Sequence, residues 1–189
     1  MAKTVLISIR PKWCEKIISG EKTIEVRKNR PKLETPFKCY IYCTLPRYPH
    51  EGFISTDYPK PQFYGGGKVI GKFTCDRIYK IDKDSTDFLF KAGGLSVYKQ
   101  AAEEKCGLRV AMTDDELHGY LGHCQGYGWH ISDLKIYDTP KELSEFPRPF
   151  ENCIDKVCDE FGCASCENGG YISRPPQSWY YVEDFSDAW

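Results

Sequence analysis

The sequence lacks any apolar run that approaches the roughly 20 residues needed for a membrane-spanning helix. Residues 1–7 hold one charge and too short an apolar stretch for a secretion signal, and they predict a first β-strand instead. Internal repeats are also absent. These absences exclude a helical membrane protein, and we expect a cytoplasmic protein that has no membrane partner.

A phosphate-binding loop of the P-loop type is missing too, because the glycine run at residues 65–67 is not followed by Lys and then Ser or Thr. With 189 residues and a hydrophobic content of 41%, the chain has the size and composition of one globular domain. Residues 45–67 are rich in Pro, Tyr and Gly, which predicts a loop insertion within that domain.

Charge is unevenly distributed, although the formal net charge is only −1. Residues 1–50 hold 11 Lys/Arg and 4 Asp/Glu, a balance of +7, whereas the remaining 139 residues hold 15 and 23, a balance of −8. A basic N-terminal third is typical of a surface that binds the phosphates of nucleic acid. A solvated charged face that acidic neighbours balance gives the same composition, so both interpretations stay open.

The hydrophobic pattern predicts the secondary structure. We expect strands at residues 3–9, 22–28, 37–44, 68–81 with a bend at Gly71, 128–137 and 178–182. We expect helices at residues 10–19, 95–105 and 113–122, the last of them capped by Thr113 with Glu116 three residues later. Because strands and helices do not alternate regularly, the chain predicts an α+β fold, a mixed β-barrel with flanking short helices, rather than a doubly wound sheet.

Residues 20–27, with the sequence GEKTIEVR, concentrate charge directly after a predicted helix. Gly20 is expected to stop that helix, and the strand that follows alternates its side chains between two faces. Alternation places Glu25 and Arg27 on one face and the neighbouring Ile and Val toward a core, while Lys22 points the other way or lies on the turn. The segment therefore gathers charge at the mouth of a cleft. An ion pair that only orients this segment is the plain alternative.

Ten cysteines are present, and four of them lie within 14 residues with the spacing C-x4-C-x4-C-x2-C, namely Cys153, Cys158, Cys163 and Cys166. Without a secretion signal, disulfides explain them poorly, whereas four thiolates around a tetrahedral zinc ion account for the cluster and for the nearby glycines. We predict a structural zinc site that folds a small insertion resembling a zinc knuckle, with two disulfides or unbound thiols as alternatives. The other six cysteines are expected to act as small hydrophobic residues.

Residues 17–27 closely resemble the signature of the ASCH domain, a branch of the PUA-like superfamily, in which a glycine ends a helix and a lysine and an arginine follow. The matching positions are Gly20, Lys22, Glu25 and Arg27. The resemblance implies a β-barrel of about five or six strands with helices around it, and a cleft lined by the signature. It also implies a single domain over residues 1–189, in which residues 45–67 and the cysteine-rich residues 150–172 are insertions.

PUA-like domains are associated with RNA, often with modified nucleobases, so the resemblance implies an RNA-binding protein. Some small ASCH proteins hydrolyse the amide of N4-acetylcytidine with a lysine, a threonine at the position of Glu25, and a glutamate from a later helix. Lys22 matches that lysine and Glu116 is a candidate for the glutamate, whereas Glu25 departs from the threonine. A related protein is described as a ribonuclease, which keeps cleavage of RNA phosphodiesters open.

We expect the cleft to bind RNA or a modified nucleotide, with DNA as a further partner to test. The predicted ligand-binding residues are Lys22, Glu25, Arg27, Arg10, Lys12 and Trp13, with Trp13, Tyr42 or Trp129 stacking a base and Lys28, Arg30 and Lys32 following the backbone. For each tryptophan, core packing is the simpler interpretation. If the protein is an enzyme, the predicted catalytic residues are Lys22 and Glu25, with Glu116 in addition. A third hypothesis is a domain that binds a protein partner through the zinc insertion.

Overall fold

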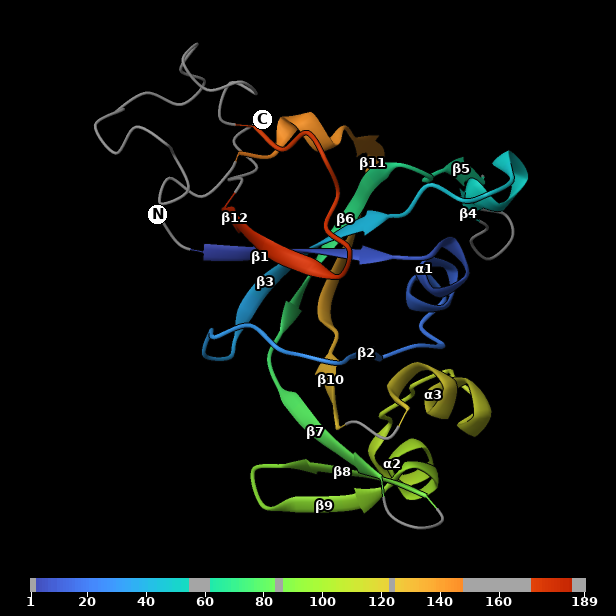
Figure 1. Cartoon of the computed structure of the whole chain (residues 1–189), viewed down its shortest axis with the longest axis vertical. Helices are drawn as coiled ribbons and strands as arrows, with labels where there is room; N and C mark the ends of the chain where they lie inside the picture. The colour runs from blue at the N-terminus through green and yellow to red at the C-terminus, as the bar shows by residue number, and fades with distance from the viewer. Residues whose placement is uncertain (1–2, 55–61, 84–86, 123–124, 148–170, 185–189) are drawn as a thin grey trace. The chain divides into compact units, whose positions relative to one another are not determined.

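The computed structural model describes residues 3–54, 62–83, 87–122, 125–147 and 171–184 (Figure 1). The described residues form a mixed α+β fold, as expected, with three sheets and three α-helices. The chain divides into two compact units. The first comprises Met1–Cys14, Lys38–Lys72 and Lys135–Trp189, and the second comprises Glu15–Phe37 and Phe73–Leu134. No helix within the described ranges is long and apolar enough to cross a membrane.

A sheet that lies mostly in the first unit has five strands in the order β11–β6–β3–β1–β12. Their bounds are β1 Lys3–Ile9, β3 Phe37–Cys43, β6 Lys68–Cys75, β11 Ser132–Lys141 and β12 Trp179–Glu183. Strand β1 is parallel to β3 and antiparallel to β12. Both β1 and β3 are almost continuously buried in their described side chains, as is typical of central strands that are covered on both faces. Cys39 and Cys43 on β3 are fully buried, as the sequence predicts.

The segment at residues 45–67, predicted as a loop insertion, contains three short elements in its described part. A 3₁₀ helix, η1, spans Pro49–Gly52, and strands β4 (Phe53–Ile54) and β5 (Phe63–Tyr64) pair as an antiparallel hairpin. Ile54 is fully buried, so it anchors the hairpin in the first unit, whereas Phe53 and Tyr64 are exposed.

The second unit is built on an antiparallel sheet of five strands in the order β2–β10–β7–β8–β9. Their bounds are β2 Ile24–Arg27, β7 Ile78–Lys83, β8 Phe88–Ala92, β9 Leu95–Tyr98 and β10 Gly126–His130. Helix α2 (Lys99–Cys106) lies beside β8 and β9, and α3 (Asp114–Leu121) follows it in the chain (Figure 1). Ile24 and Val26 join Ala102 of α2 and Leu117 of α3 in one core, which confirms the predicted apolar face of β2.

Two predicted helices begin and end close to the expected positions. Helix α1 spans Pro11–Ile18, and Gly20 follows it in the left-handed region with a φ of 76°. Helix α3 has the predicted capping box, because the Thr113 side chain accepts from the Glu116 N–H and the Glu116 side chain accepts from the Thr113 N–H.

The helix predicted at residues 95–105 is wrong in its first part, where the chain forms strand β9. Gly93 and Gly94 have positive φ values of 54° and 84° and make the two-residue turn of a hairpin, in which Ala92 of β8 pairs with Leu95 of β9. Such turns need positive φ at both central residues, which glycine adopts without a steric cost. The helix proper, α2, begins only at Lys99.

The strand predicted at residues 68–81 is in fact two strands, β6 and β7, which belong to different sheets. The break falls after Cys75 rather than at Gly71. A Cβ at position 71 would lie 2.4 Å from the Lys135 carbonyl oxygen of β11, so this glycine permits close strand pairing and makes no bend. The chain changes sheet at this break, and the described strands form two five-stranded sheets and a two-stranded hairpin, with no closed barrel among them.

The cysteine cluster lies outside the described residues, as does most of the insertion predicted at residues 150–172. The zinc site predicted for Cys153, Cys158, Cys163 and Cys166 therefore stays a prediction.

Candidate functional site

Three charged side chains of the second unit meet below its surface. Arg27 Nη2 lies 2.9 Å from Glu25 Oε1, and Lys22 Nζ lies 3.5 Å from Glu25 Oε2. The exposed fractions of Lys22, Glu25 and Arg27 are only 2%, 5% and 6%. We call these three residues the polar triad. Strand alternation predicts that Glu25 and Arg27 share a face, and Lys22 joins them from the turn before the strand.

The turn after α1 explains how Lys22 reaches this position. Gly20 takes the left-handed conformation, and the Lys22 N–H then donates to the Lys16 carbonyl oxygen at 2.7 Å. Lys22 therefore precedes β2, whose first residue is Ile24, and the alternation of side chains along the strand does not fix its direction.

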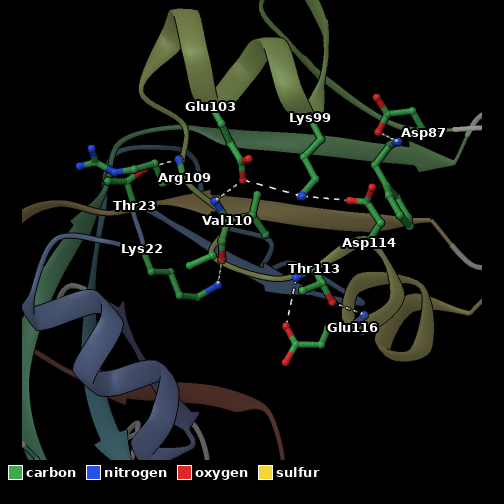
Figure 2. A network of polar contacts seen from close by, with 12 residues as sticks. Lys22, Thr23, Asp87, Lys99, Glu103, Arg109, Val110, Thr113, Asp114 and Glu116 are labelled. Carbon is green, nitrogen blue, oxygen red and sulfur yellow. Dashed lines mark hydrogen bonds and ion pairs between the residues drawn. The ribbon is translucent and has the colours of Figure 1, made fainter.

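A backbone segment far away in the sequence completes the surroundings of Lys22. Its ammonium group donates to the Val110 carbonyl oxygen at 2.8 Å. The Val110 N–H in turn donates to Glu103 of α2 at 3.3 Å, and Lys99 of the same helix lies 2.9 Å from Asp114 of α3 (Figure 2). Lys22 thus ties the start of β2 to a polar network that reaches both helices of the second unit.

The neighbouring Thr23 fixes the same segment. The Thr23 and Ile24 N–H groups both donate to the Arg109 carbonyl oxygen, at 2.8 and 3.0 Å, and the Thr23 hydroxyl donates to the Gly107 carbonyl oxygen at 2.9 Å. These contacts with the backbone at residues 107–110 could not be found from the sequence, because a carbonyl acceptor leaves no residue-type signal.

Burial dominates the electrostatics of the polar triad. Desolvation lowers the pKa of Lys22, and the nearby cations Arg27 and Lys16 act in the same direction, whereas Glu25 opposes the shift. The triad holds two cations and one carboxylate. Glu25 Oε2 is buried and faces the Lys22 ammonium at 3.5 Å, so both carboxylate oxygens are directed at cations of the triad.

The aromatic residues predicted to stack a base are mostly buried. Trp129 pairs with Glu25 across β10 and β2, but it has no exposed surface and packs edge-to-face on Phe37 at a centroid distance of 5.8 Å. Tyr42 is 6% exposed and lies in the core of the first unit. Core packing, the simpler interpretation, accounts for both rings.

Three further predicted ligand-binding residues belong to the first unit. Arg10 and Lys12 are exposed, and the Lys12 ammonium lies 4.5 Å from the centroid of the partly buried Trp13 ring. The site built from the polar triad uses residues of the second unit alone.

Glu116, the predicted additional catalytic glutamate, has a local role. Its Oε2 accepts from the Thr113 N–H at 3.0 Å in the capping box that starts α3 (Figure 2). The cap gives the glutamate a structural role, and its catalytic role stays a prediction.

An exposed basic loop follows the polar triad directly. Lys28, Arg30 and Lys32 are all exposed, and we call them the basic loop. The Lys28 ammonium lies 5.5 Å from the centroid of the Tyr120 ring, and the Arg30 guanidinium lies 5.9 Å from that of Tyr127. The sequence predicts these cations, but it gives no sign of the two tyrosines, which come from α3 and β10.

Metal binding finds no support in the part of the chain that the structure describes. No group of three or more His, Cys, Asp or Glu residues there is arranged to hold a metal ion.

Comparisons with known proteins point to one family. Residues 7–112, which include the polar triad and the basic loop, match the family model of the ASCH domain. The crystal structure of ASCH from Zymomonas mobilis is similar at a TM-score of 0.53 and 17% identity, over 96% of this chain and 88% of that one. A tyrosine-to-phenylalanine mutant of the same protein matches at a TM-score of 0.52 and 17% identity, over 97% and 92%. At this identity the likeness concerns the fold alone. No curated protein sequence matches significantly.

Proposed function

Because the chain belongs to the ASCH domain family, we propose that it binds nucleic acid, with RNA or a modified nucleotide as the ligand. The observation that carries the proposal is the continuity of β2 with the basic loop. Arg27, the last residue of the strand, belongs to the polar triad, and the exposed cations Lys28 and Arg30 follow it with tyrosine rings beneath them. Cations interleaved with aromatic rings suit a single strand, whose phosphates and unstacked bases are both accessible.

The two parts of this surface have different roles in the proposal. The basic loop contacts phosphates, which supplies affinity without sequence preference. The polar triad fixes the end of β2, from which the loop starts, and the Glu25 carboxylate is the proposed acceptor for an amino group of a base. In this proposal, Lys22 and Arg27 contact carbonyl or phosphate oxygens of the bound nucleotide. In the first unit, Arg10, Lys12 and Trp13 stay predicted ligand contacts.

Fluorescence anisotropy with short single-stranded RNA and DNA oligonucleotides tests the proposal. We expect binding that weakens as salt increases, because bound phosphates release counterions. A thermal-shift screen of modified nucleosides tests whether a free nucleoside is the ligand. If no oligonucleotide binds in a salt-dependent way and no nucleoside stabilises the protein, the proposed function is wrong.

Hydrolysis of an amide in a modified nucleoside is the second candidate function. The lowered pKa of Lys22 favours it, because a lysine of lowered pKa can supply the neutral amine that acts as a base or nucleophile. With N4-acetylcytidine, the reaction would add water and release acetate and cytidine. Lys22→Ala should then abolish release of acetate while nucleoside binding is retained. Under the binding function, no acetate appears even with the wild-type protein, and Lys22→Ala weakens binding.

A further inference from the structure

The first unit carries an exposed aromatic surface that the proposed function does not use. The described residues include seven exposed large hydrophobic side chains, and four of them, Leu45, Tyr48, Phe53 and Tyr64, fall within residues 45–64. Tyr48 is 51% exposed and Phe53 is 49% exposed. Because a folded chain normally buries such rings, a local concentration of exposed ones indicates an interaction surface.

Part of this surface is a stack of flat groups. The Arg47 guanidinium lies 5.5 Å from the centroid of the Tyr48 ring. The His50 ring lies 5.8 Å from the same centroid, and the two ring planes are inclined by only 14°. The guanidinium of Arg47 and the ring of His50 are therefore two planar groups that lie near the Tyr48 ring.

The other part is a tyrosine that glycines hold in place. Tyr64 packs edge-to-face on Phe53 across the β4–β5 hairpin, with ring centroids 5.2 Å apart. A Cβ at Gly52 would lie 2.5 Å from the Tyr64 ring, and one at Gly66 would lie 3.0 Å from its hydroxyl. The Gly65 N–H donates to the Gly52 carbonyl oxygen at 2.9 Å. Gly66, in the glycine run at residues 65–67, therefore leaves room for the Tyr64 ring, as Gly52 does.

We propose that Arg47, Tyr48, His50, Phe53 and Tyr64, here called the aromatic platform, form a second nucleic-acid surface, on which bases of a single strand stack. Bases stack on aromatic rings and on guanidinium planes, and stacking tolerates any base because every base has a π-face. The guanidinium of Arg47 adds a cation to the platform, which suits the charge of a polyanion. The inference takes its class of ligand from the proposed function, but it rests on other residues.

Tyr48 gives the sharpest test, because both Arg47 and His50 lie near its ring and its exposure makes its removal compatible with folding. The probe is a single-stranded RNA of ten nucleotides that contains 2-aminopurine, whose fluorescence falls when the base stacks on a ring. We expect Tyr48→Ala to weaken binding about tenfold and to abolish the fall in fluorescence, and Tyr48→Phe to keep both. Tyr98→Ala is the matched control, because Tyr98 is 45% exposed and lies in the second unit.

The outcomes separate this inference from the proposed function. If the RNA binds and Tyr48→Ala matches the wild type in affinity and fluorescence, the aromatic platform takes no bases and the inference is overturned. If no RNA binds at all, the proposed function fails, and adenosine monophosphate then tests the platform by itself. In proton NMR spectra of the wild type, addition of adenosine monophosphate should shift the ring-proton resonances of Tyr48 and His50. Unchanged resonances would overturn the inference.

Discussion

Lys22 is the most deeply buried residue of the polar triad. It is a cation with 2% of its surface exposed, held by one carboxylate and one backbone carbonyl oxygen. Removing a charge from water costs several kcal/mol, which the Glu25 carboxylate at 3.5 Å and the Val110 carbonyl oxygen at 2.8 Å do not fully restore. The lowered pKa of Lys22 is the physical expression of that cost.

The first prediction concerns the pH dependence of stability. Because burial lowers the folded pKa of Lys22 below its unfolded value of 10.5, the unfolded chain binds more protons between these two values. The free energy of unfolding contributed by Lys22 should therefore rise with pH across that window. Urea denaturation of the wild type and of Lys22→Met measures this contribution as the difference between their free energies of unfolding. Contributions from other groups that titrate at alkaline pH cancel in that difference.

Lys91→Met is the control, because Lys91 is exposed and its pairing with Asp82 lies at the surface. Its difference from the wild type should stay flat in the same pH range. If the difference for Lys22→Met also stays flat or falls with pH, the buried lysine does not have a lowered pKa.

Residue identity predicted only part of the site. The positions of Lys22, Glu25 and Arg27 follow from the signature, and the shared face of the last two follows from strand alternation. The Val110 carbonyl oxygen lies 88 residues away and carries no side-chain signal, so it could not be predicted. For Trp129 the sequence leaves both base stacking and core packing open, with core packing the simpler interpretation, and its full burial confirms core packing.

At the scale of elements, local signals were reliable where one short motif determines the structure. The capping box predicted the start of α3, and Gly20 predicted the end of α1. The apolar spacing at residues 95–102 also fits a helix, which is why the sequence predicts a helix where the Gly93–Gly94 turn in fact starts strand β9. The break between β6 and β7 has no strong breaker residue, so a continuous strand was the natural expectation.

The second prediction concerns the connection between α2 and α3. Ala111 has a φ of 58°, in the left-handed region where an alanine costs about 1–2 kcal/mol. Ala111→Gly relieves this strain, while glycine adds about 0.5–1 kcal/mol of unfolded-state entropy. We expect the free energy of unfolding to increase by about 0.5–1 kcal/mol, measured by urea denaturation.

Ala102→Gly is the contrasting variant, because Ala102 is buried within α2 and has no strain to relieve. It should lower the free energy of unfolding by about 1 kcal/mol or more. Equal losses in the two variants would show that position 111 is not strained.

The third prediction also belongs to an element, the cysteine-rich segment. We propose that Cys153, Cys158, Cys163 and Cys166 bind one structural zinc ion, because four closely spaced thiolates complete a tetrahedral site. Elemental analysis of the purified protein should give one equivalent of zinc per chain. Cys153→Ser should lower that value, whereas Cys106→Ser should not, because Cys106 lies elsewhere and is exposed. A protein free of zinc would contradict the proposal.

At the scale of the whole molecule, positive and negative charges are concentrated in different parts of a sequence whose net charge is close to zero. The balance of +7 in residues 1–50 covers the basic loop and Arg47 of the aromatic platform, so both proposed surfaces draw on the basic part of the chain. Separated charge of this kind steers a polyanion to one part of a protein while the net charge stays small. The composition could predict the class of ligand, but it could not show which cations lie over aromatic rings.

The salt dependence of RNA binding tests the central claim most directly, when the basic loop is altered against a matched control. The measurement compares Lys28→Ala/Arg30→Ala with Lys80→Ala/Lys105→Ala, which removes the same charge from other exposed positions of the second unit. In a plot of log affinity against log salt, loss of two phosphate contacts should reduce the slope for single-stranded RNA by about 1.4, because each contact contributes about 0.7. The control pair should keep the wild-type slope. Equal slopes for all three proteins would contradict the account, because the basic loop would then contact no phosphate.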